Sequence, residues 1–350
     1  MDLFYEKILR PLFFRLGPER AHEYGRNFLQ TLSMARPACG LLARVNQGKS
    51  AVELAGLRFR NRVGLAAGMD KDAEFVPAAA AMGFGHVEVG TVTPKSQPGN
   101  PQPRLFRYPQ HEAVINRMGF NNRGMEAMGK KLRRLPPPGK RTCIVGVNIG
   151  KNKKTPLEEA TGDYLACFQN LADLADYFTV NVSSPNTQGL RELQEKSRLL
   201  EILGELQKAN RERGEGALPI FLKIAPDLTF RQIGEILEVV GETGMTGIVA
   251  TNTTISRETL PEAGSFEQGG LSGRPLQARS TEIVRFIARE TGGRMPLIGV
   301  GGIHDAASAG EKIDSGAHLV QLYTGWIYRG PLFAAHLARA LRQTGSPKWY

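Results

Sequence analysis

The stretch PLIGVGGI, residues 296–303, shows the unit from which the fold is built. A short apolar run suited to a buried strand ends in glycines, and a helix-compatible segment follows. The same succession occurs at 63–67, 86–92, 142–149, 177–183, 219–225, 247–251, 296–300 and 318–323. Eight such units predict the α/β class and a closed (β/α)₈ TIM barrel. An open doubly wound sheet has the same periodicity and is the alternative.

The chain outside these units divides into two parts. Residues 1–45 predict an amphipathic N-terminal helical extension of two helices, interrupted at Gly17-Pro18, and residues 46–350 form the barrel domain. Residues 104–116 hold two short β-like runs around Pro109, which we expect to form an excursion over the barrel mouth.

Composition limits the classes of partner. Lys and Arg number 45 against 34 Asp and Glu, a net charge of +11, which favours anionic partners. No basic block stands out, so we expect no nucleic-acid binding. The three cysteines, Cys39, Cys143 and Cys167, are far apart, and neither they nor the six histidines have metal-ligand spacing, so we expect no metal.

Asparagines follow several predicted strands, where a barrel carries its chemistry. Asn148, Asn181, Asn186 and Asn252 follow the third, fourth and sixth strands, and Asn116 ends the excursion. An amide offers both a donor and an acceptor, so converging asparagines suit a planar ligand edged with N–H and C=O groups. A lone asparagine is more typical of a turn or a helix cap, whereas five at successive strand ends favour a site.

Glycines and two lysines complete the candidate site. Glycines after the seventh and eighth strands, with the run 269–273 as a further wall, suit a phosphate bound by backbone N–H groups. Lys223 lies inside an apolar strand and needs a counter-charge or an electron-rich ligand; a Schiff-base lysine is an alternative. Lys71 follows small residues that permit close approach of a flat ligand, and its alternative is a surface charge paired with Asp70 or Asp72.

Ten motifs, in order along nearly the whole chain, resemble the dihydroorotate dehydrogenase family. They are GLAAGMDKD (64–72), GTVTP (90–94), PRLFR (103–107), INRMGFNN (115–122), NIGKN (148–152), NVSSPNT (181–187), LKIAPDL (222–228), ATNTT (250–254), GGLSGRPL (269–276) and IGVGGI (298–303). The resemblance implies an FMN-binding barrel that oxidises dihydroorotate to orotate in pyrimidine (UMP) synthesis. The N-terminal extension, and Ser184 where soluble members have Cys, imply class 2, which passes the electrons to a quinone.

Site residues follow from the motifs. The resemblance implies that FMN is held by Ala67, Gly68, Lys71, Thr91, Asn148, Asn181, Lys223, Thr251, Gly273, Gly302, Tyr323 and Thr324. It implies that the substrate contacts Lys71, Asn116, Arg117, Met118, Gly119, Phe120, Asn181, Asn186, Asn252 and Thr253. Ser184 is the implied catalytic base for C5 of dihydroorotate, with Lys71 beside it. A free Ser hydroxyl is a poor base, so its surroundings must polarise it or relay its proton.

The resemblance also implies partners. Ubiquinone or menaquinone enters between the N-terminal helices, along a tunnel with His22, Arg107 and Tyr323 as polar lining. The apolar residues of the extension face lipid while Lys7, Arg10 and Arg15 meet anionic headgroups. A helical lid packed on the barrel is the alternative. We expect a monomer, peripheral on the cytoplasmic side of the cell inner membrane.

Two other functions compete with this reading. A Schiff-base aldolase would use Lys223 and carry no flavin colour. A regulatory protein that binds flavin or phosphate without turnover has no need of Asn116, Asn181, Ser184, Asn186 and Asn252.

Overall fold

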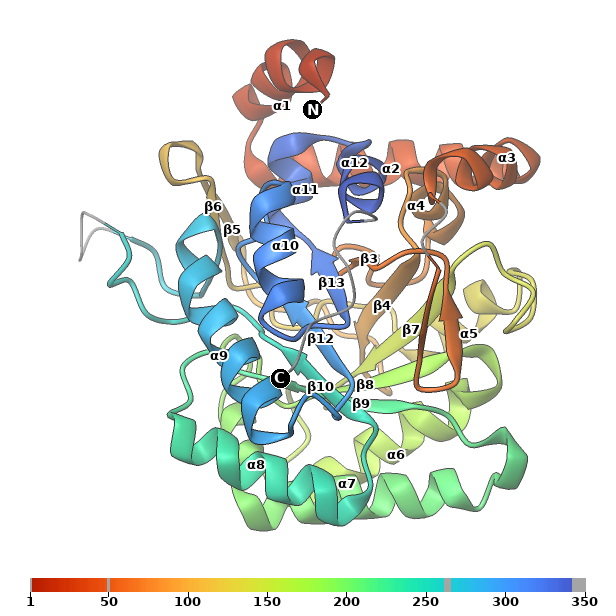
Figure 1. Cartoon of the computed structure of the whole chain (residues 1–350), viewed down its shortest axis with the longest axis vertical. Helices are drawn as coiled ribbons and strands as arrows, with labels where there is room; N and C mark the ends of the chain where they lie inside the picture. The colour runs from red at the N-terminus through yellow and green to blue at the C-terminus, as the bar shows by residue number, and fades with distance from the viewer. Residues whose placement is uncertain (1, 49–50, 261–265, 342–350) are drawn as a thin grey trace.

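A closed barrel of eight parallel strands forms the body of the protein (Figure 1). The computed structural model describes residues 2–48, 51–260 and 266–341. Around the barrel lie β3 (Val63–Leu65), β4 (His86–Val92), β7 (Ile144–Ile149), β8 (Tyr177–Asn181), β9 (Ile220–Ile224), β10 (Gly247–Ala250), β12 (Leu297–Val300) and β13 (Leu319–Leu322). Each strand falls within one predicted run, and β13 pairs with β3 to close the sheet. The barrel prediction is confirmed, and the open sheet is excluded.

Helices follow the strands and cover the outside of the barrel. They are α4 (Val76–Ala81), α5 (Met125–Leu132), α6 (Ala160–Leu171), α7 (Lys196–Arg211), α8 (Phe230–Thr243), α9 (Gln277–Glu290), α10 (Ala306–Asp314), α11 (Thr324–Arg329) and α12 (Phe333–Ala340). Short 3₁₀ turns occupy Pro109–His111, Leu157–Glu159, Ala172–Leu174, Leu190–Gln194, Gly214–Gly216 and Arg274–Leu276.

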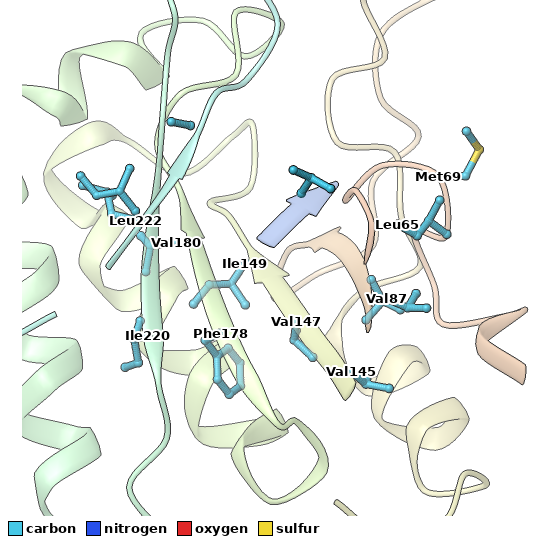
Figure 2. Close-up of a cluster of buried hydrophobic side chains, with 14 of the residues drawn as sticks. Leu65, Met69, Val87, Val145, Val147, Ile149, Phe178, Val180, Ile220 and Leu222 are labelled. Carbon is cyan, nitrogen blue, oxygen red and sulfur yellow. The ribbon is translucent and has the colours of Figure 1, made fainter. Parts of the chain in front are cut away.

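Successive side chains of each strand point alternately outward and inward. The outward ones form an apolar layer under the helices, and the inward ones form a partly polar barrel interior. On β8, Phe178 and Val180 pack against the helices, beside apolar side chains of β7 and β9 (Figure 2). Tyr177 and Asn181 face inward. A Cβ on Gly146 would lie 2.1 Å from Cζ of Tyr177, so glycine makes room for the phenol ring. Each fully buried apolar side chain contributes roughly 1.5–3 kcal/mol, which fixes the register of the strand.

Two smaller sheets complete the ends of the barrel. The hairpin of β1 (Val52–Leu54) and β2 (Leu57–Phe59) adds Leu54 and Phe59 to the inner apolar cluster. The predicted excursion is β5 (Leu105–Tyr108) and β6 (Ala113–Asn116). The run 269–273, expected as a further wall of the site, forms β11 (Gly270–Gly273), which pairs with β6, and its Ser272 and Gly273 line the cavity at the barrel mouth. This three-stranded sheet forms one side of the barrel mouth.

The N-terminal extension is helical, with one helix more than predicted. A π-helical turn, Tyr5–Leu9, leads into α1 (Arg10–Arg15), followed by α2 (Pro18–Met34) and α3 (Arg36–Asn46). The interruption at Gly17-Pro18 is confirmed. Arg10 donates to the carbonyl of Tyr328, so it points to the barrel and not outward as expected. None of the helices within the described residues is long and apolar enough to cross a membrane.

Candidate active site

A cavity opens at the carboxyl ends of the barrel strands and gathers nearly all of the predicted site residues. Its lining includes Ala67, Gly68, Lys71, Thr91, Asn116, Met118, Gly119, Phe120, Asn181, Ser184, Asn186, Lys223, Thr251, Asn252, Thr253, Gly273, Gly302, Tyr323 and Thr324. Residues more than 250 positions apart in the chain meet here because parallel strands end on the same side of the barrel.

Two predicted residues lie outside this lining. Asn148 is buried beneath it and acts through Thr91 and Asn181, as described below. The Arg117 side chain is held elsewhere: its Nε donates to the carbonyl of Pro103 (3.0 Å), and its guanidinium lies over the Phe106 ring (5.1 Å to the ring centroid). The structure therefore does not bring the Arg117 side chain to the predicted substrate position.

A chain of hydrogen bonds links the floor of the cavity to a carboxylate inside the barrel. Thr91 Oγ1 donates to Asn148 Oδ1 (2.5 Å), and Asn181 Nδ2 donates to Thr91 Oγ1 (2.9 Å). Asn148 Nδ2 then donates to Glu88 Oε1 (2.8 Å). Because an ionised carboxylate can only accept, Glu88 fixes the direction of every donor in the chain.

Glu88 collects further donors on its second oxygen. Tyr177, Thr179 and Gln321 donate to Oε2 at 3.2, 3.1 and 2.9 Å. Glu88 is fully buried, so these hydrogen bonds replace the water that it loses. Gln321 also lines the cavity, and its Oε1 is buried without a hydrogen-bond partner among the described residues.

The remaining asparagines form a second group over the cavity. Asn252 Nδ2 donates to Asn181 Oδ1 (3.3 Å) and to Ser183 Oγ (3.0 Å). Asn186 Nδ2 donates to Asn116 Oδ1 (3.1 Å) across the mouth. Asn181 ends β8 and Asn186 follows it, whereas Asn116 ends β6 and Asn252 follows β10, so the four amides orient one another in two pairs. They can present donors and acceptors to a planar ligand, as the sequence predicted.

Ser184 lies at the rim of this amide group and is 6% exposed. Its Oγ accepts a hydrogen bond from the Asn186 backbone N–H (3.3 Å). No histidine lines the cavity within the described part of the chain. A Ser–His nucleophile arrangement is therefore not formed there.

Both lysines line the cavity, and burial lowers the pKa of each. Lys71 Nζ donates to Asn121 Oδ1 (2.6 Å), and no ion pair joins it to Asp70 or Asp72, both of which are described. Burial, helped by Arg104, lowers the pKa of Lys71 to about 7. Burial also lowers the pKa of Lys223, while the charge of Glu88 opposes that shift. Both cations therefore favour an anionic or electron-rich ligand.

Glycines shape the far end of the cavity. A Cβ on Gly302 would lie 2.2 Å from Cα of Gln277, and one on Gly325 would lie 2.0 Å from the carbonyl oxygen of Ile303. Only glycine fits at these positions, and main-chain groups therefore line this end. Ser272 Oγ and Thr324 Oγ1 lie 2.8 Å apart beside them. Two hydroxyls among glycines suit phosphate oxygens.

A second, apolar cavity of about 330 Å³ separates the N-terminal helices from the barrel. His22, Arg107 and Tyr323 all line it, as predicted for the tunnel. Arg107 donates to the carbonyls of Phe13 and Leu16 at the end of α1, and it lies 4.4 Å above the Phe14 ring centroid. Burial, with the charge of Lys71, lowers the pKa of His22 to about 3, so its imidazole is neutral at pH 7.

Sequence reasoning missed Glu88, Gln321 and Asn121. Glu88 and Gln321 each sit at an inward position of a strand whose neighbours are apolar. That polar interruption of an apolar strand was the available signal. Asn121 lies within the quoted motif INRMGFNN, but nothing in its spacing separates a lysine partner from a turn residue.

Comparison with known proteins identifies relatives over nearly the whole chain. The family model described as dihydroorotate dehydrogenase matches residues 49–344. A dihydroorotate dehydrogenase (quinone) of Christiangramia forsetii is 49% identical, covering 97% of this chain and 99% of its own; one of Chloroflexus aurantiacus is 50% identical, covering 97% and 96%. A crystal structure of DHODH from Eimeria tenella in complex with ferulenol is similar, with a TM-score of 0.80, 38% identity and coverage of 93% of this chain and 90% of its own.

Proposed function

The chain belongs to the dihydroorotate dehydrogenase family, and on that premise we propose how its two cavities divide the reaction. It is a quinone-dependent flavoprotein oxidoreductase that oxidises dihydroorotate to orotate in pyrimidine biosynthesis. The aldolase and the regulatory reading are therefore set aside. The proposal concerns the identity of the flavin, the roles of the residues, and the membrane.

FMN is the proposed flavin. The residues fit it: the cavity is lined by Lys223 and by Gln321, whose Oε1 has no partner among the described residues, and also by glycines with the Ser272 and Thr324 hydroxyls. The first pair suits the polar edge of an isoalloxazine ring, and the second suits a phosphate. When bound, the flavin supplies hydride acceptance from dihydroorotate and electron delivery to quinone.

The chain's own residues bind and orient the substrate. The amides of Asn116, Asn181, Asn186 and Asn252 hydrogen-bond the ring N–H and C=O groups of dihydroorotate, and Lys71 attracts its carboxylate. Ser184 Oγ takes the proton from C5 of the substrate. The Asn186 N–H that donates to Ser184 Oγ favours a partly negative oxygen, which supports this role.

Quinone occupies the apolar cavity, with His22 and Arg107 near its carbonyl groups. Tyr323 lines both cavities and stands between the two half-reactions. This shared wall is the observation that carries the proposal. The flavin cavity and the quinone cavity adjoin at Tyr323, so electrons can pass from one bound ligand to the other while each stays in its own cavity.

We propose that the N-terminal helices lie on a membrane surface. Phe4, Ile8 and Leu12 are 49–61% exposed on the first helical segment, and Phe28 on α2 is 65% exposed. Exposed apolar side chains on helices beside a quinone cavity favour a lipid surface over water. We place the enzyme as a peripheral monomer on the cytoplasmic side of the cell inner membrane.

Four measurements test these points. Heat-released flavin identified as FMN by mass supports the cofactor, and riboflavin or FAD contradicts it. Anaerobic dihydroorotate must bleach the flavin absorption, and added quinone must restore it.

For the membrane, Phe4→Glu combined with Phe28→Glu must reduce co-sedimentation with anionic lipid vesicles. Ile255 is also apolar and exposed but lies on a barrel loop, so Ile255→Glu must not reduce it. Sedimentation velocity must give the mass of one chain.

A further inference from the structure

Lys312 of α10 is a buried cation without an acidic partner. Its exposed fraction is 0%, and its Nζ donates to Ser280 Oγ (2.5 Å) and to Thr281 Oγ1 (3.0 Å), both on α9. No ion pair joins it to a carboxylate in the part of the chain that the structure describes. An ammonium buried between neutral groups is costly unless an anion compensates it.

The ammonium lies directly behind a loop of the cavity. Ser280 Oγ donates to the carbonyl of Gly301 (3.0 Å), and Gly301 and Gly302 line the end of the cavity assigned to phosphate. A Cβ on Gly299 would lie 3.0 Å from Cδ of Lys312, so the lysine stem packs under the end of β12. One hydroxyl therefore separates the charge from the loop.

Neighbouring charges do not compensate Lys312. Burial lowers the pKa of its ammonium to about 7, and only Glu311 opposes this among the described residues. The Glu311 carboxylate accepts from Gln277 Nε2 (2.9 Å) at the exposed surface. An anion bound at the Gly301–Gly302 end of the cavity would be separated from this ammonium by the Ser280 hydroxyl and the loop.

We propose that Lys312 is a positioning residue for the cofactor: its buried charge is the counter-charge of the phosphate, and it braces the Gly301–Gly302 loop through Ser280. The inference rests on the proposed FMN site. On this proposal, Lys312 contributes to binding of the FMN phosphate but not to binding of the isoalloxazine ring.

Riboflavin, which lacks the phosphate, provides the test. Holoenzyme is incubated with a series of riboflavin concentrations, and the fraction of FMN retained gives the exchange constant. We expect Lys312→Met to reduce the preference for FMN over riboflavin by roughly tenfold to a hundredfold, the effect of one charge across a few ångströms of protein. Lys312→Gln, which removes the charge but keeps a polar amide, is a second variant with the same expected loss.

Thr281→Val is the matched control. It removes one hydroxyl partner of Lys312 and keeps the charge, so the FMN preference must stay within about threefold of the original protein. An equal fall in Thr281→Val and Lys312→Met would assign the effect to packing and overturn the inference. An unchanged preference in both Lys312 variants would also overturn it. If the unsubstituted protein itself does not prefer FMN, the proposed cofactor fails first, and the two failures are thereby distinguished.

Discussion

Glu88 Oε1 accepts a hydrogen bond of 2.8 Å from Asn148 Nδ2 in the barrel interior. The amide of Asn148 is thereby turned so that its oxygen faces Thr91 and Asn181. A carboxylate that touches no proposed ligand thus decides which atoms the cavity floor presents. The orientation of the floor depends on a charge buried below it.

Glu88→Gln should destabilise the protein. Both Glu88 oxygens accept hydrogen bonds, so the NH₂ group of the glutamine faces a donor and at least one buried hydrogen bond is lost. We expect the free energy of unfolding to fall by about 1–3 kcal/mol. Chemical unfolding monitored by circular dichroism measures this. Thr179→Val, which removes a single donor to Glu88, should cost less. If the two variants are equally stable, Glu88 does not organise the network.

Ser184→Ala should slow flavin reduction by dihydroorotate on the order of 10²–10⁴-fold, because the variant lacks the proposed base. Flavin should stay bound, since no flavin contact is assigned to Ser184. Anaerobic stopped-flow absorption measures the rate. Ser183→Ala is the control: Ser183 hydrogen-bonds Asn181 and Asn252 but is not the proposed base, so its loss should be smaller. The reverse ranking would move the base to Ser183.

Orotate binding should weaken as the pH rises above about 7. The pKa of Lys71 is lowered to about 7, so its ammonium is present below that pH and is lost above it. The product is an anion and binds the charged form, so its dissociation constant should rise about tenfold per pH unit until the pKa of the complex is reached. Spectral titration of the flavin measures this between pH 6 and 9. In Lys71→Met, binding should be weak and independent of pH; a slope retained in that variant would assign the titration to another group.

Gly25→Leu should obstruct the apolar cavity. Gly25 lines that cavity, and a Cβ there meets no atom within 4 Å, so a side chain can enter without disturbing the helix. The KM for a short-chain quinone should rise roughly tenfold or more, while flavin reduction by dihydroorotate is unchanged. Gly40→Leu on α3 has equally open space and lies outside the cavity lining, so it should leave both half-reactions unchanged. A normal quinone KM in Gly25→Leu would place the quinone elsewhere.

The sequence predicted the strands well because burial on both faces leaves clear apolar runs between glycine turns. It predicted the amide cluster because strand order alone brings strand ends together. It did not predict β11, because Gly270–Gly273 has little apolar alternation and is recruited by pairing with β6. It predicted a helical extension to residue 45 but not its division into α2 and α3, although Pro37 stands in the first turn of α3, a position typical of proline.

Side-chain direction was harder to predict than element type. Lys312 stands next to Glu311 and near Asp314 in the sequence and so resembles a surface lysine, yet the turn of α10 places it against α9. Arg117 lies within a predicted binding motif, but a cation–π contact and a backbone carbonyl draw its side chain outward. Both outcomes depend on neighbours that are distant in sequence.

Tyr323 is the one described residue that lines both cavities. Compounds lodged under the N-terminal helices should therefore inhibit without competing against the pyrimidine, and both could occupy one molecule together.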